Sequence, residues 1–120
     1  MSKFEKFIYK HHKAYPYPIV SLGRNKLLYF HVRAMTKIVK DNKYGILYYN
    51  EQDNLIGIEF IDNYKPGAYT ITRARGNRLG YISANAFLRY YDISHEKGTT
   101  YRLCFSEEDK IFILTIESVS

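Results

Sequence analysis

Apolar and polar residues alternate in short runs along this chain, and one pattern of alternation occurs twice. Residues 48–60 and 104–116 align at a constant separation of 56, and each segment is an apolar run, an acidic turn and a second apolar run. Such runs, bounded by turn residues, are typical of β-hairpins. At the same separation Val32-Arg33 matches Leu88-Arg89, each inside a run with helical spacing. The sequence therefore predicts one supersecondary unit that is used twice.

The first unit is predicted over residues 19–62. Gly23–Lys26 has the composition of a turn, and it carries two cations at its tip. The segment 31–39 has helical spacing, with Val32, Met35, Ile38 and Val39 expected to face inward. The strands of this unit are expected at 19–22, 27–30, 44–49 and 55–61, the last two around an acidic turn at 50–54.

The second unit is predicted over residues 68–120, after a linker at 63–67 that is rich in turn-forming residues. Its first turn, Arg73–Gly80, is longer and holds three arginines. A helix is expected from Ser83 to Tyr91, because a serine hydroxyl can cap the free amides of the first turn. The strands of this unit are expected at 68–72, 81–82, 101–105 and 111–116.

The fold class that follows is mainly β with two short helices, an α+β fold. A four-stranded unit with one helix cannot bury both faces of its strands, whereas two copies can remove each other's exposed edges. We therefore expect two tandem ββαββ repeats that form one closed barrel, residues 19–120, about a pseudo-two-fold axis. Residues 1–18 are expected to be a basic arm, in which Pro16 and Pro18 end any helix.

Leu22-Gly23-Arg24, the helix arginines Arg33 and Arg89, and the acidic hairpin turns resemble the swapped-hairpin barrel family of AbrB-type regulators, MazE-type antitoxins and MraZ. The resemblance covers about residues 19–118 and implies a DNA-binding transcriptional regulator. The family usually has a proline at the start of the helix, and neither predicted helix here has one. The chain is also similar to uncharacterised small bacterial and phage proteins that combine an "ISA-AFL-YY-I" helix with a preceding "LIGI" hairpin. This similarity does not suggest a particular activity.

Charge is distributed unevenly along the chain. The net charge is +6, but residues 1–50 hold ten Lys or Arg and two acids, which gives +8. A one-sided basic region is typical of proteins that bind polyanions, although a solvated basic surface is the alternative. Guanidinium groups on rigid turns can contact phosphates or guanine edges, and the repeat predicts that both basic turns lie on one side. The predicted DNA-binding residues are Arg24, Lys26, Arg33, Arg73, Arg75, Arg78, Arg89, Lys3, Lys6, Lys10 and Lys13.

Two other interpretations stay open. A single-stranded nucleic-acid binder could stack bases on tyrosines, for which the candidates are Tyr44, Tyr48, Tyr69 and Tyr81. A protein-interaction module, such as an antitoxin-like protein or a phage-type inhibitor, could anchor a partner on Phe4, Phe7 and Ile8 of the arm. Two repeats can close one barrel as a monomer, and a homodimer is common among such regulators.

Catalytic and metal-binding patterns are lacking in the sequence. His11-His12, His31 and His95 have no nucleophile or ligand at a recognisable spacing, so we expect no enzyme, metal or cofactor. The single cysteine, Cys104, is expected to be an inert core residue in a strand and fits a reducing compartment. No apolar run approaches the length of a membrane span and no signal peptide is visible, so a cytoplasmic protein without a membrane partner is expected.

Overall fold

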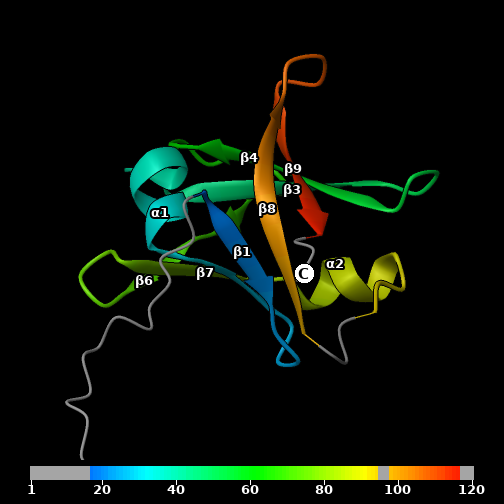
Figure 1. The fold of residues 1–120 in the computed structure, drawn as a ribbon, viewed down its shortest axis with the longest axis horizontal. Helices are drawn as coiled ribbons and strands as arrows, with labels where there is room; N and C mark the ends of the chain where they lie inside the picture. The colour runs from blue at the N-terminus through cyan, green and yellow to red at the C-terminus, as the bar shows by residue number, and fades with distance from the viewer. Residues whose placement is uncertain (1–16, 95–97, 117–120) are drawn as a thin grey trace, which may run out of the picture.

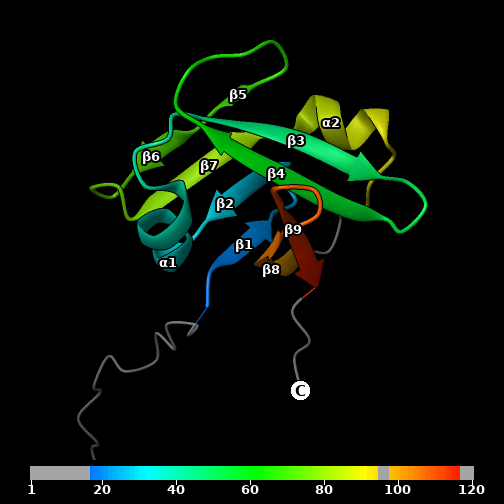
Figure 2. The same ribbon diagram turned by 90° about the horizontal axis from the view of Figure 1, so that it is seen from above.

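The computed structural model describes residues 17–94 and 98–116, and it is mainly β. Its strands form one antiparallel sheet that curls into a nearly closed barrel, with only two short helical segments beside it (Figures 1 and 2). The expected class, mainly β with two short helices, is therefore confirmed for this part of the chain. Nearly all of the predicted basic arm lies outside the described residues.

The elements follow the chain in two series, one on each side of the loop that follows residue 61. The first series comprises β1 (Ile19–Leu22), β2 (Leu27–Phe30), α1 (Val32–Ala34), the π-helix η1 (Met35–Val39), β3 (Tyr44–Asn50) and β4 (Leu55–Ile61). The second comprises β5 (Tyr69–Thr70), β6 (Thr72–Ala74), β7 (Leu79–Ser83), α2 (Asn85–Tyr90), β8 (Thr99–Ser106) and β9 (Ile111–Ile116). Among the described residues, no helix has the length and apolar character that crossing a lipid bilayer requires.

The sheet closes through one bent segment of chain. Its strands lie in the order β5-β3-β4-β9-β8-β1-β2-β7-β6, and the two end strands are separated in sequence only by Ile71. The chain therefore passes at Ile71 from the edge of β3 to the edge of β7 (Figure 2). The Ile71 amide donates to the Lys43 carbonyl at 2.9 Å, which holds this bend. Both ends of the sheet are thereby joined, and little edge stays free for pairing with other chains.

The interior of the barrel is apolar because one face of each strand points inward. Successive side chains of a strand alternate between its two faces, so inward residues are two apart. Val20 and Leu22 of β1 are buried in this way, as are Leu28 and Phe30 of β2. The helical segments cover the barrel with five further buried side chains, which are Ala34 of α1, Met35 and Val39 of η1, and Phe87 and Leu88 of α2. Within the described residues, no polar or charged side chain is buried.

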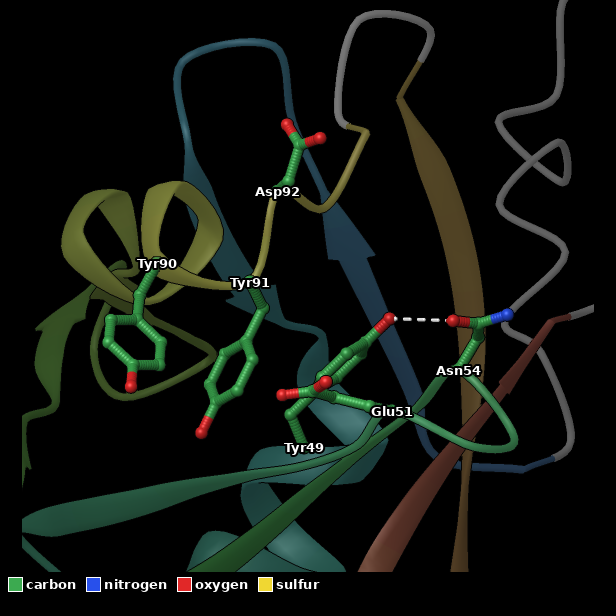
Figure 3. Close-up of a pocket in the computed structure, with 6 residues that line it drawn as sticks. All are labelled: Tyr49, Glu51, Asn54, Tyr90, Tyr91 and Asp92. Carbon is green, nitrogen blue, oxygen red and sulfur yellow. Dashed lines mark hydrogen bonds between the residues drawn. The ribbon is translucent and has the colours of Figure 1, made fainter.

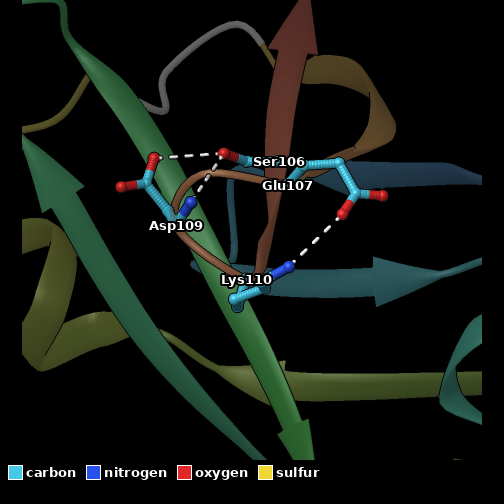
Figure 4. Close-up of polar contacts among 4 residues, drawn as sticks. All are labelled: Ser106, Glu107, Asp109 and Lys110. Carbon is cyan, nitrogen blue, oxygen red and sulfur yellow. Dashed lines mark hydrogen bonds and ion pairs between the residues drawn. The ribbon is translucent and has the colours of Figure 1, made fainter.

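Both predicted hairpins are present, and their turns have the same construction. Asn50 Oδ1 accepts from the Asp53 amide at 3.1 Å, and Ser106 Oγ accepts from the Asp109 amide at 3.2 Å (Figure 4). These two pairs of residues are 56 apart, the separation at which the segments align. Side-chain oxygens that accept from the backbone two or three residues onward stabilise turns, so the alternation and the turn residues together specify both hairpins.

The turn expected to carry three arginines is shorter than predicted and carries two, Arg75 and Arg78. The strand β6 extends through Ala74 and β7 begins at Leu79, so the turn covers residues 75–78 and not 73–80. Pairing of Thr72 with Tyr81 and of Arg73 with Gly80 draws these residues into the ladder. Ser83, the predicted helix cap, is the last residue of β7 and pairs with Leu27. The residue at the N-cap is Ala84, which forms no side-chain cap.

The predicted match between the two helices is also wrong in register. The helix α1 begins at Val32 and α2 begins at Asn85, a separation of 53 and not 56. Arg33 is therefore the second residue of its helix, whereas Arg89 is the fifth of its own. A match of only two residues does not determine the register of a helix, because packing against the barrel decides which of its residues face inward.

Two predicted core residues are exposed. Val32 is 43% exposed, because the barrel contacts the face of α1 and η1 that carries Ala34, Met35 and Val39. Cys104 lies in a strand as predicted, but its side chain is exposed, and Sγ lies 3.6 Å from the Thr115 hydroxyl oxygen. Leu103 is buried, so alternation along β8 turns the next side chain outward.

Candidate nucleic-acid interface

The two basic turns do not lie side by side, contrary to the prediction. The strand β2 follows the turn at residues 23–26, and β7 follows the turn at residues 75–78. These strands pair antiparallel, with Leu27 opposite Ser83 and Phe30 opposite Gly80. Each turn therefore lies at the opposite end of the ladder from the other, and Figure 1 shows them pointing in different directions. The predicted arginines thus divide into two groups.

One group lies where the β6–β7 hairpin meets the first helical segment (Figures 1 and 2). A Cβ placed on Gly80 would lie 2.6 Å from the Sδ of Met35, so the lack of a side chain at position 80 lets the Met35 side chain of η1 pack closely on β7. Arg73 Nη2 donates to the Asn42 carbonyl at 2.6 Å, which ties β6 to the loop after η1. The Nη2 group of Arg73 therefore holds β6 against the loop after η1, within the candidate interface.

These elements carry many cations and one acid. Residues 31–43 and 72–79 contain seven Lys or Arg, and Asp41 is their single acidic residue. Five of the seven are exposed and make no ion pair with another residue that the structure describes: Lys37, Lys40, Lys43, Arg75 and Arg78. Unpaired, solvated cations keep their full charge available to an anionic ligand. We call the set Arg33, Lys37, Lys40, Lys43, Arg73, Arg75 and Arg78 the basic end.

The tip of the basic end is a tight turn with left-handed backbone. Arg75, Gly76 and Asn77 have φ angles of 53°, 62° and 67°, and the Arg78 amide donates to the Arg75 carbonyl at 3.2 Å. Positive φ at both central residues suits the right-handed twist of a hairpin, and glycine and asparagine adopt it at little cost. A Cβ placed on Gly76 would have no heavy atom of the described residues within 4 Å apart from its two chain neighbours, so the backbone of the tip is open to a ligand.

The second group of predicted residues surrounds the β1–β2 turn and α2. Lys26 has a φ of 67°, and its carbonyl accepts from the Ala84 amide at 2.9 Å, so α2 begins beside this turn. Arg24 is at the tip and Arg89 is exposed on α2. This group has fewer cations, and an acid, Asp92, lies two residues beyond the end of α2. Lys3, Lys6, Lys10 and Lys13 lie outside the described residues.

A hydroxyl–imidazole pair joins β1 to the start of α1, and sequence reasoning missed it. Ser21 Oγ and His31 Nε2 are 2.7 Å apart, and burial lowers the pKa of His31 below its ordinary 6.5. Hydroxyl and imidazole are ten residues apart in sequence, so only the β1–β2 pairing reveals their contact. Catalysis by such a pair needs a third group that orients the imidazole. No group of three or more His, Cys, Asp or Glu that could hold a metal occurs in the described part of the chain.

We expect Gly80→Ala to lower the free energy of unfolding by about 1–3 kcal/mol, because the new methyl group would overlap the Met35 side chain. Urea denaturation would measure this. In a Met35→Ala background the same substitution should cost less than half as much, since the crowding atom is gone. Equal costs in both backgrounds would show that Met35 does not constrain this position.

Stability should also depend on the protonation of His31. The unfolded chain takes up a proton near pH 6.5, whereas the folded protein resists it, so the stabilisation is fully present above that pH and is lost as pH falls. Urea denaturation between about pH 7.5 and pH 5 would measure the slope. His31→Gln should flatten it, with His11, His12 and His95 unchanged as internal controls. An unchanged slope in the variant would contradict the assignment.

No protein-family model matches the chain, and neither a curated protein nor a solved structure matches it. The charges and contacts of the described residues therefore carry the functional argument.

Proposed function

We propose that this protein is a DNA-binding transcriptional regulator of the AbrB and MraZ type, and that it binds duplex DNA through the basic end. We further propose that its barrel consists of two tandem ββαββ repeats about a pseudo-two-fold axis, in the swapped-hairpin arrangement. The observation that carries the DNA-binding proposal is the gathering of seven cations on the adjoining segments 31–43 and 72–79, which themselves contain one acid. The proposed role is binding, and no catalytic step is assigned to it.

The order of the strands supports the repeat. We treat β5 and β6 as one bent strand, so that the strand order closes into a ring. If each strand of the first series is then exchanged with its counterpart in the second, β1 with β6, β2 with β7, β3 with β8 and β4 with β9, the order around the ring is unchanged. The pairing of β1 with β8 then corresponds to the pairing of β5 with β3. Such an order is expected when each hairpin of one unit is paired with strands of the other.

The register of two ladders supports it as well. Gly57 pairs with Ile113, and these residues are 56 apart, the separation of the two hairpins. The pairs on either side, Ile56 with Leu114 and Ile58 with Phe112, exchange under the same shift. In the other ladder Tyr29 pairs with Tyr81, 52 apart, and its flanking pairs exchange likewise. Each ladder is therefore centred on a local two-fold relation, and the second repeat is four residues longer around its helix.

The chemistry of the basic end favours a polyanion with regularly spaced charges. Lysine and arginine side chains that replace condensed counterions on phosphates gain free energy from the release of those ions. Arg75 and Arg78 stand at the tip of a two-stranded hairpin, an element narrow enough to approach a groove of duplex DNA. The lysines on η1 and the loop after it would then contact the flanking phosphates.

The tyrosines give less support to single-stranded nucleic acid. Base stacking needs exposed ring faces beside cations. Tyr81 packs on Tyr29 with ring centroids 5.9 Å apart, and Tyr44 packs on Tyr64 at 5.6 Å. Tyr48 is 42% exposed, but its hydroxyl donates to Glu59 at 3.0 Å, so an acid lies beside it. Duplex DNA therefore fits the described surface better than stacked bases do.

Binding to a fluorescent duplex should weaken steeply with salt. If all seven cations contact phosphates, the logarithm of the binding constant should fall with the logarithm of salt concentration with a slope of about −6. Fluorescence anisotropy would measure this, and the Arg75→Ala/Arg78→Ala variant should make the slope less negative by about 2. Both side chains are exposed, so the fold should tolerate the change.

Arg24→Ala/Arg89→Ala is the matched control, because it removes two arginines from the other end of the β2–β7 ladder. It should change the slope by less than one. A larger loss from this control would move the interface to the β1–β2 turn. Absence of binding to any duplex at low salt would contradict the proposal, and tighter binding to the single strand would replace it with the rival interpretation.

A further inference from the structure

A hollow of ≈ 270 Å³ lies at the end of the β3–β4 hairpin, where the turn approaches the end of α2 (Figure 3). Its lining residues come from two segments that are far apart in sequence. They are Tyr49, Glu51 and Asn54 from the hairpin, and Tyr90, Tyr91 and Asp92 from α2 and the residues that follow it. None of them belongs to the basic end or to the predicted DNA-binding residues.

Three tyrosine rings form the walls. Tyr91 lies between the other two, with its ring centroid 4.8 Å from that of Tyr49 and 4.8 Å from that of Tyr90. The Tyr90 and Tyr91 planes stand at 79°, so an edge of one ring meets a face of the other. Tyr90 is 80% exposed and contributes little to the core. Rings set at a steep angle present more than one negative π-face to a small ligand.

The walls are held in place before any ligand arrives. The Tyr49 hydroxyl donates to Asn54 Oδ1 at 3.0 Å, across the turn of its own hairpin. Behind the rings Phe87 is buried, and its centroid lies 5.2 Å from that of Tyr91 and 6.2 Å from that of Tyr49. The rings of Tyr49 and Tyr91 are therefore held in place before a ligand arrives, which reduces the entropy lost on binding.

The charge of the hollow is negative. Glu51 and Asp92 are its ionisable acids, and neither forms an ion pair with another described residue. Figure 3 shows the Glu51 carboxylate beside the rings of Tyr49 and Tyr91, while the Asp92 carboxylate points away from them. Glu51 is thus placed to contact a bound group directly, and Asp92 adds negative electrostatic potential from the edge of the hollow.

The corresponding position in the other hairpin lacks this chemistry. At a separation of 56, Phe105 replaces Tyr49 and Lys110 replaces Asn54, while Glu107 corresponds to Glu51. Lys110 Nζ lies 3.4 Å from the Glu107 carboxylate, so that acid already has a cation (Figure 4). The comparison shows that an acid in this turn does not by itself leave an open negative site.

We propose that the Tyr49–Tyr90–Tyr91 hollow binds an organic cation, an alkylammonium or guanidinium head group, with Glu51 as its counter-ion. Aromatic faces attract such cations through their quadrupole, and a carboxylate at the same place adds Coulomb attraction. The head group could belong to a free small molecule or to a Lys or Arg side chain of a peptide. Both present the same chemistry to the rings.

Choline and Nα-acetylarginine amide serve as the two probes, titrated into the full-length protein by NMR. We expect saturable shifts of the Tyr90 and Tyr91 signals with at least one probe, and none with 3,3-dimethylbutanol, the neutral isostere of choline. Preference for choline would indicate a free alkylammonium ligand, and preference for the arginine derivative would indicate a peptide side chain. Equal binding of the neutral isostere, or no saturable shift with either cation, would overturn the proposal.

Two exposed positions allow variants that leave the fold intact. Glu51→Gln and Tyr90→Leu should each weaken the better probe by about two- to fivefold, the range for a solvent-exposed cation–π or ionic contact. Glu107→Gln is the matched control in the corresponding turn and should not change the affinity. The proposal fails if Glu107→Gln weakens the probe as much as Glu51→Gln does, because general surface charge would then explain the binding.

Discussion

The antiparallel pairing of β2 with β7 decides where the charged loops of this protein lie. Each of these strands begins directly after a basic turn. Because the strands pair antiparallel, the two turns lie at opposite ends of one ladder. Each turn then lies beside the helix of the other series, as the contact between Gly80 and Met35 shows at one end and the bond from Ala84 to Lys26 shows at the other. The pairing thus determines which helical segment lies beside each basic turn.

The sequence predicts the hairpins well because their determinants are local. Alternation sets the inward faces of β3, β4, β8 and β9, and the side-chain oxygens of Asn50 and Ser106 set the turns. The direction of the basic turns could not be predicted, since it depends on a pairing between strands about 52 residues apart. Helix register failed for a related reason. Short helices take their inward positions from the surface they cover, and two matching residues do not specify that surface.

The candidate sites show the same difference between local features, which the sequence predicts, and long-range contacts, which it does not. Composition identified the seven cations of the basic end in part, because charge can be counted, but their neighbourhood depends on the bend at Ile71 and the close approach of η1 to β7. The tyrosine hollow was not predicted, because Tyr49 and Tyr91 are separated in sequence by the four strands β4–β7, the turns and loops that connect them, and the helix α2. An adjacent tyrosine pair that follows an arginine, Tyr90-Tyr91, was the available signal, and it is equally typical of a strand.

The two proposed sites are related by the distribution of charge: cations gather at the basic end, and acids gather at the tips of the two long hairpins. The basic end carries one acid, whereas the tip of the β3–β4 hairpin carries Glu51 and Asp53 and that of the β8–β9 hairpin carries Glu107, Glu108 and Asp109. A polyanion held at the basic end would be repelled from these tips, which favours one orientation of the protein on its ligand. The same tips attract cations, and of the two only the β3–β4 tip lacks a lysine at this position and has tyrosine walls. Asn54 and Lys110 occupy corresponding positions of the two hairpins, so a single difference in side-chain charge separates a tip whose acid is paired from one whose acid is open to a cation.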